Sequence, residues 1–452
     1  MANTAVQMKK TDLIHGPIGK SLFLFALPML IGNLFQQFYN MVDSVIVGQF
    51  VGENALAAVG ASYALTTVFI SIAVGGGIGA SVLTSRYLGA EDYHNLRLSV
   101  HTSLISFLVF SVVLGAGGYF FSPMILRALN TPPVVQEQAD VYLRIYFIGL
   151  PFLFMYNILS SIFNALGRSR IPLYFLIFSS LLNVGLDLFM VRVMNLEVAG
   201  VAIATVIAQG VSAVLSFAVL VKLLGTFPKT GRVKLFDAGY FWKMLSIAVP
   251  SILQQSIVSI GMMLVQSVVN GFGEAMLAGF SAAMRIESIC VVPLAAMGNA
   301  VSTFVAQNLG AGQKERAAKG YRVSYGILFG FALIIMVSLE FFHTPIIQSF
   351  LGADSSPDAL NTGVSYLKFM GFFFIMLGLK MCTDGALRGA GDMKVFTWAN
   401  LLNLAIRVSF AYLFAPVLGI QAVWIAVPIG WTANYVVSLI RYCSGKWKKI
   451  EI

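Results

Sequence analysis

Hydrophobic positions run along almost the whole chain in long stretches, separated by short polar segments. The first stretch begins after Lys20 and continues to about Gly48. An apolar stretch of about 20 residues is long enough to cross a bilayer as a helix, and a strand of a soluble sheet is much shorter. We therefore expect about twelve membrane-spanning helices. They are predicted at residues 21–48, 55–82, 98–120, 138–163, 172–192, 198–222, 240–270, 275–306, 322–342, 360–386, 394–416 and 420–442.

Composition supports the same fold class. The chain has 452 residues, of which 58% are hydrophobic and 11% charged, whereas a soluble protein carries about 25% charged residues. Its mean hydropathy is +0.84. A soluble fold of this size would lack the side chains to cover its surface. The first apolar run has no small-residue cleavage pattern, so it is expected to stay in the protein. The prediction is an all-α integral membrane protein.

The distribution of basic residues predicts the orientation. If both termini are cytoplasmic, most of the 29 Lys and Arg residues fall in the termini and in the connections on that side. Near the opposite face lie Arg127, Arg144, Arg192 and Lys368. This asymmetry follows the positive-inside rule. It also accounts for the net charge of +10 without a nucleic-acid partner, because the charges are spread over many connections. The short connections favour a prokaryotic plasma membrane, with lipids around the protein.

The two halves of the sequence resemble each other at an offset of about 220 residues. The segment ending at Pro28 matches the one ending at Pro250, and Asn183 matches Asn403. Two halves with an even number of spans share one orientation and are related by an axis along the membrane normal. We expect two pseudo-symmetric six-helix lobes, at residues 1–224 and 239–452, joined by a cytoplasmic linker at 225–238.

Several segments, in this order, resemble the multidrug and toxic compound extrusion (MATE) family. They are Pro28, Gln36–Asp43, Gly52, Leu56–Gly60, Gln307–Gly312 and Leu387–Asp392. Each is weak alone, but together they are specific and span nearly the whole chain. The resemblance implies two six-helix lobes. It also implies export of drugs or organic cations in exchange for inward Na⁺ or H⁺.

Polar residues inside the predicted spans of the first half form a candidate coupling site. Charged residues within a span are costly and are functional candidates by default. Asp43, Asp187 and Thr205 lie at similar depth in the outer half of the bilayer, and Asn183 shares a helix face with Asp187. Tyr142 is close to the same level. Two neighbouring carboxylates in low dielectric resist ionising together, so a proton or a hard cation should be held between them.

The resemblance to the family implies that four of these residues match the cation site of the first lobe. They are Asp43, Asn183, Asp187 and Thr205. An oxygen cluster with carboxylates suits Na⁺ as well as H⁺. Gln36 and Tyr39 share the Asp43 face of the first span and are candidates for a substrate cavity. Structural hydrogen bonding between helices is the alternative for all of these polar residues.

The second half carries a different set of charges in its spans. Arg407 occupies the position that corresponds to Asp187. Lys380 and Asp384 are four residues apart and can pair. Arg285 and Glu287 are two apart and cannot face each other on one helix. Arg285, Glu287, Asp384 and Arg407 are candidates for the substrate cavity, with an internal ion-pair network as the alternative.

The sequence indicates a transporter rather than an enzyme. No nucleophile and base pattern, H-E-x-x-H or C-x-x-C occurs, and no cofactor is expected apart from the coupling ion. The glycines at 75–79 lie within a span and predict close helix packing. The leading hypothesis is an antiporter that exports amphipathic small molecules by alternating access, with no obligate protein partner. A flippase for lipid-linked oligosaccharides is the alternative, because Arg285, Lys380 and Arg407 could attract a phosphate.

Overall fold

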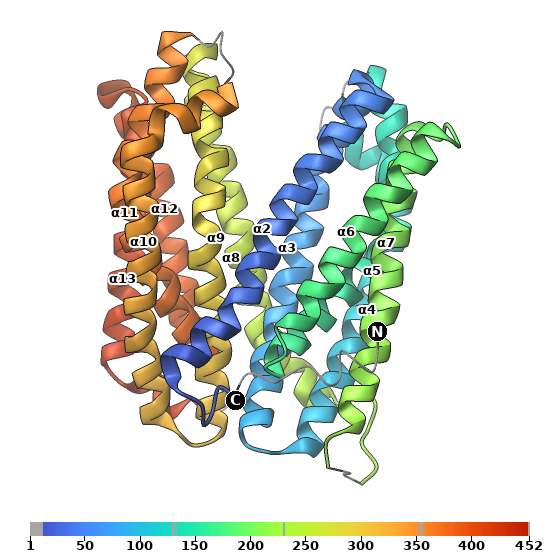
Figure 1. Ribbon diagram of the computed structural model, residues 1–452, viewed down its shortest axis with the longest axis vertical. Helices are drawn as coiled ribbons and strands as arrows, with labels where there is room; N and C mark the ends of the chain where they lie inside the picture. The colour runs from blue at the N-terminus through green and yellow to red at the C-terminus, as the bar shows by residue number, and fades with distance from the viewer. Residues whose placement is uncertain (1–11, 129–130, 132, 229–230, 352–355, 451–452) are drawn as a thin grey trace. The chain divides into compact units, whose positions relative to one another are not determined.

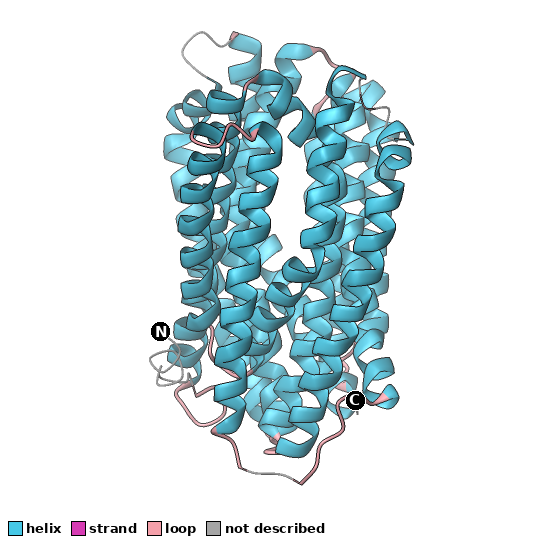
Figure 2. Cartoon of the chain, turned by 90° about the vertical axis from the view of Figure 1, so that its right-hand side faces the viewer, coloured by secondary structure: helices cyan, strands magenta, loops and turns pink. Residues whose placement is uncertain are grey.

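The computed structural model describes residues 12–128, 131, 133–228, 231–351 and 356–450. Every regular element in these ranges is helical and none is a strand (Figure 2). Within these described ranges, twelve helices are long and apolar enough to span a membrane. This confirms the predicted fold class and number of spans.

The spanning helices follow one another with short connections. Their bounds are α2 (Ile18–Ile46), α3 (Glu53–Gly89), α4 (Tyr93–Ala128), α5 (Pro133–Ala165), α6 (Arg170–Arg192), α7 (Glu197–Gly225), α8 (Ala238–Asn270), α9 (Glu274–Gly310), α10 (Lys314–Leu351), α11 (Pro357–Ala390), α12 (Met393–Leu418) and α13 (Gln421–Cys443). A π-helical turn, η1 (Val47–Val51), prolongs α2, and a 3-10 turn, η2 (Lys446–Lys449), follows α13.

Most helices extend beyond the apolar stretches that predicted them. The largest difference is α10, expected at 322–342 and observed at Lys314–Leu351. It bends at Phe342, where φ is −118°, and contains Pro345 three residues later. Proline has no N–H to bond the carbonyl one turn earlier, which explains a bend at this point. The apolar pattern thus predicted the straight middle part of the helix. It missed the polar first turns and the segment after the bend.

The chain forms two compact units. One contains Ile31–Ile252, and the other contains Asp12–Leu30 together with residues 253–450. The boundaries fall inside α2 and α8, shortly after Pro28 and Pro250. The first turns of each of these helices therefore belong to the unit formed mainly by the other half of the sequence. This differs from a division at the connection 225–238.

Polar contacts explain both exchanged segments. Before α2, the carbonyl of Leu13 accepts a hydrogen bond of 3.1 Å from Asn308 Nδ2, and the Arg316 guanidinium donates to Gly16 O. In the other unit, Arg97 donates to the carbonyls of Leu224 and Phe227 at 2.9 and 3.2 Å. These bonds satisfy carbonyls that the helices leave unpaired. They hold the start of α2 in the second unit and the connection after α7 in the first.

The first unit is built around α5, which packs against α3, α4 and α7 (Figure 1). The predicted close packing at the glycines of α3 is confirmed. A Cβ at Gly77 would lie 2.4 Å from Ser161 Oγ of α5, and one at Gly79 would lie 2.7 Å from Met244 O of α8. Small residues let helix backbones approach closely within a membrane.

The second unit is built around the α9–α11 pair, whose backbones touch along much of their length. A Cβ at Gly279 would lie 2.1 Å from Ala359 O, and one at Gly385 would lie 2.2 Å from Gly298 O. A Cβ at Gly389 would lie 2.2 Å from Ser302 O. α10 and α13 also pack on α11, so this pair forms the centre of the second unit.

Candidate functional site

The first unit gathers the polar side chains that the sequence singled out in its spans. α2 contributes Tyr39 and Asp43, which lie on one face because they are four residues apart. α6 contributes Asn183 and Asp187 with the same spacing, and their side chains are 1% and 0% exposed. Thr205 enters from α7. Five side chains from three helices that are distant in sequence thus meet in one cluster, in which Asn183 and Asp187 are buried.

Asn183 is the centre of the hydrogen bonds. Its side-chain amide lies 2.8 Å from Tyr39 Oη and 3.3 Å from Thr205 Oγ1. The amide orientation that satisfies all its neighbours places Nδ2 toward Asp187, to which it donates at 3.0 Å. Asn183 therefore joins α2, α6 and α7 and orients the Asp187 carboxyl toward α2.

The two carboxyl groups of the cluster face each other. Asp43 and Asp187 are close enough to share a hydrogen bond, which requires one of them to carry a proton. Each also keeps a buried Oδ1 atom without a partner among the described residues. No basic side chain within the described ranges forms an ion pair with either carboxyl. The arrangement can hold one proton, or a small hard cation in its place.

Apolar side chains surround this cluster. Val47 of η1 packs with Val191 of α6 and with Val198 and Val201 of α7, and Tyr142 packs against them. Tyr142 stacks on Tyr146 with a ring distance of 6.4 Å and interacts electrostatically with both aspartates. These side chains reduce the access of water, so an unshared charge between the carboxyls would be poorly solvated.

Two residues predicted to line a substrate cavity, Tyr39 and Gln36, form hydrogen bonds within the first unit. Tyr39 belongs to the aspartate cluster through its bond to Asn183. The four-residue spacing from Asp43 was the sequence signal for this placement. Gln36 lies one turn earlier, and its amide donates to Asn40 Oδ1 at 3.1 Å. No contact with the carboxyl pair is seen for Gln36 in the part of the chain that the structure describes.

The charged candidates of the second unit separate into distinct groups. Lys380 Nζ lies 2.9 Å from Asp384 Oδ2, as their spacing predicted. Asp384 also accepts a hydrogen bond of 3.2 Å from Ser438, and Lys380 donates to Asn400 at 3.2 Å. Both charges are buried and paired, which favours the structural alternative for this pair.

Glu287 and Arg407 lie apart from that ion pair. Glu287 is buried and accepts a hydrogen bond from the Tyr366 hydroxyl of α11. Arg407 interacts electrostatically with Glu287 without forming an ion pair. Arg285 is exposed on α9 and does not join them. Tyr366 was not predicted, although it lies as far into α11 as Tyr142 lies into α5.

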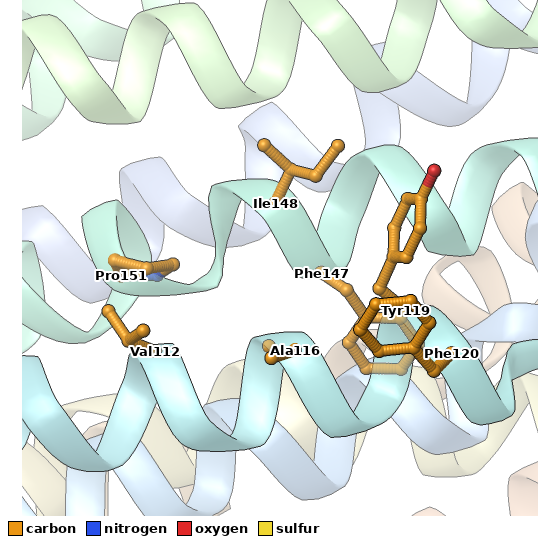
Figure 3. A pocket seen from close by; sticks show the side chains of 8 residues that line it. Val112, Ala116, Tyr119, Phe120, Phe147, Ile148 and Pro151 are labelled. Atoms are coloured by element: carbon orange, nitrogen blue, oxygen red, sulfur yellow. The ribbon is translucent and has the colours of Figure 1, made fainter.

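A cavity in the first unit, away from the aspartate cluster, is a poor candidate for an ion-coupling or drug-binding site. It has a volume of about 300 Å³ and lies between α4 and α5, where Gly115 lets α4 approach Phe147 O. Figure 3 shows Val112, Phe120 and Ile148 around it. Its lining is apolar except for the Tyr119 hydroxyl, and Phe120 and Ile148 are 76% and 60% exposed. Such a surface suits contact with lipid chains.

Comparisons with known proteins agree with this architecture. The family model MatE matches residues 28–189 and 250–413, one stretch in each half, and the stretches begin at Pro28 and Pro250. The probable multidrug resistance protein YpnP of Bacillus subtilis (strain 168) is 30% identical over 98% of this chain and 99% of that protein. The FAD transporter of Shewanella oneidensis is 25% identical, with 92% of each protein covered.

Solved structures show the same fold. The crystal structure of MATE in complex with MaL6 superposes with a TM-score of 0.90 at 25% identity and covers 98% of this chain and 100% of that one. An outward-facing multidrug resistance MATE family transporter superposes with a TM-score of 0.88 at 25% identity, covering 98% and 99% of the two chains.

Proposed function

Because the chain belongs to the MatE family of membrane transporters, we propose that it is an efflux antiporter for amphipathic small molecules, driven by inward H⁺ or Na⁺. The observation that carries this proposal is the Asp43–Asp187 pair, in which Asp187 is buried and neither carboxyl group has a basic partner among the described residues. A relative named as a probable multidrug resistance protein supports drugs as substrates.

Binding of the ion is proposed to drive transport through a change of conformation. The aspartate cluster lies wholly within the first unit and connects α2 with α6 and α7. A proton or Na⁺ held between Asp43 and Asp187 removes the repulsion between the carboxylates and changes the hydrogen bonds available to α2. A bound ion shifts the conformational equilibrium only if the two states differ in affinity for it. Alternating access would provide that difference.

The proposal is tested by transport in vesicles that contain only the purified protein. Ethidium uptake against its gradient is measured under a Na⁺ gradient and, separately, under a pH gradient. We expect uphill transport with at least one gradient and none when both are collapsed. Ethidium movement that is indifferent to both gradients would contradict coupling. Movement of a phospholipid-linked sugar in the same vesicles would instead support the flippase alternative.

We further propose that the protein lies in the plasma membrane with both termini in the cytoplasm, as the basic residues predict. Cys443 offers a direct test because it is exposed at the end of α13, whereas Cys382 is buried. A membrane-impermeant maleimide should label Cys443 in inside-out vesicles and not in intact bacterial cells. Cys443→Ser is the control that identifies the labelled residue. Labelling in intact cells that disappears in this variant would reverse the orientation.

A further inference from the structure

The second unit contains a cavity whose lining includes one buried charged side chain. Its volume is about 190 Å³, and α8, α9, α11, α12 and α13 all contribute to its lining. Arg407 of α12 supplies the positive charge, and Phe280, Met284 and Tyr366 supply much of the apolar and aromatic wall. Gln266 adds an amide. No acidic residue is among the lining residues, so Arg407 is their only formal charge.

One donor of the Arg407 guanidinium, Nε, has no hydrogen-bond partner among the described residues. The side chain is 9% exposed, and Nε itself is buried. Glu287 interacts electrostatically with Arg407 but forms no ion pair with it within 4.0 Å among the described residues, and its carboxylate accepts a hydrogen bond from the Tyr366 hydroxyl. Gly430 of α13 leaves room for the arginine, because a Cβ there would lie 2.9 Å from Arg407 Cγ. A buried guanidinium donor without an acceptor is costly, and a bound anion can supply the acceptor.

The internal repeat places this cavity at the counterpart of the aspartate cluster. Arg407 lies about 220 residues after Asp187, which is the offset of the repeat, and Tyr366 lies as far into α11 as Tyr142 lies into α5. Val265, which lines the cavity, lies as far after Pro250 as Asp43 lies after Pro28. The two carboxyl groups of the first unit are thus replaced by a valine and an arginine. The same location has carboxyl groups in one unit and a cation in the other.

We propose that the cavity around Arg407 binds the carboxylate of a small amphipathic aromatic acid. The planar guanidinium can bind a carboxylate through two parallel hydrogen bonds, and the aromatic and methionine side chains suit a flat apolar body. The volume fits one ring or two fused rings. The inference rests on the proposed function in one respect, namely that the bound acid is an exported substrate. It adds organic anions to the substrates of this transporter.

Binding to the purified full-length protein tests the site independently of transport. 1-Naphthoate is titrated calorimetrically, and its neutral methyl ester is the comparison ligand. We expect naphthoate to bind at least about tenfold more tightly than the ester. Arg407→Gln should weaken naphthoate binding at least about tenfold, because the charged hydrogen bond is lost. Arg285→Gln is the matched control, because this arginine is exposed on the same unit and does not line the cavity.

A second variant keeps the test decisive if Arg407→Gln does not fold. Met262 lines the cavity and is 43% exposed, so Met262→Trp should fill the space and weaken naphthoate binding while keeping the charge. Equal binding of acid and ester, or affinity unchanged in both variants, would overturn the proposal. Displacement of naphthoate by anionic phospholipid at trace amounts would also overturn it, by assigning the cavity to lipid. Ion-driven ethidium transport without naphthoate binding would refute this site and leave the proposed antiport standing. Naphthoate binding without ion-driven ethidium transport would refute the antiport and leave this site standing.

Discussion

Asp43→Asn and Asp187→Asn are each expected to abolish ion-driven export while the protein remains folded. Each variant leaves one carboxyl group that can no longer share a proton or a cation with the other. Coupled carboxyl groups titrate as a pair, so the loss of either changes the behaviour of both. The fold should tolerate the change, because asparagine keeps the size of the side chain and removes the repulsion between two neighbouring carboxylates. The expected loss of uphill transport is at least about tenfold, since ion binding between the pair is the proposed driving step.

The measurement is ethidium accumulation against its gradient in vesicles, with the amount of folded protein determined by size-exclusion chromatography. Asp140→Asn is the matched control. Asp140 lies in the same unit but is engaged by Arg144 at 2.8 Å and by Ser122 at 2.6 Å, away from the aspartate cluster. We expect this variant to transport as the unchanged protein does. If both Asp43→Asn and Asp187→Asn still export uphill at the original rate with the same ion, the coupling site lies elsewhere.

Gly385→Val is expected to prevent folding of the second unit. A Cβ at this position would lie 2.2 Å from the carbonyl oxygen of Gly298, and a backbone atom cannot move aside as a flexible side chain can. α9 and α11 would have to separate along the interface on which the unit is built. Overpacking of a core costs about 1–3 kcal/mol and occasionally more, and a clash with a backbone atom leaves little room for relaxation. The fraction of monodisperse protein extracted in mild detergent should fall accordingly.

Gly326→Val provides the control for this effect. Gly326 also lies inside a spanning helix, α10, but a Cβ there meets no atom within 4 Å. The two variants add the same side chain to the same kind of element, so a difference between them reports the contact with α9. Equal amounts of folded protein from both would show that α9 and α11 are not in close backbone contact.

The sequence alone determined features that depend on one helix at a time. The number of spans could be predicted because an uncharged apolar stretch has few alternatives to crossing the bilayer. The Lys380–Asp384 pair could be predicted because residues four apart share a face of a helix. The glycines at 75–79 indicated close packing because residues without a side chain let the backbone of a neighbouring helix approach.

Only the tertiary structure decided which helix faces meet. Helical periodicity orders the residues around one axis, but it does not say which neighbour each face contacts. Tyr39, for example, bonds to Asn183 across α2 and α6, and the face of α2 on which it lies does not predict this partner. Arg285 and Glu287, close in sequence, have different surroundings because one is exposed and the other is bound by Tyr366. The exchange of the first turns of α2 and α8 between the units also depends on partners far away in sequence, such as Asn308 for Leu13. Contacts of this kind arise from packing between helices, which the apolar pattern of each helix leaves open.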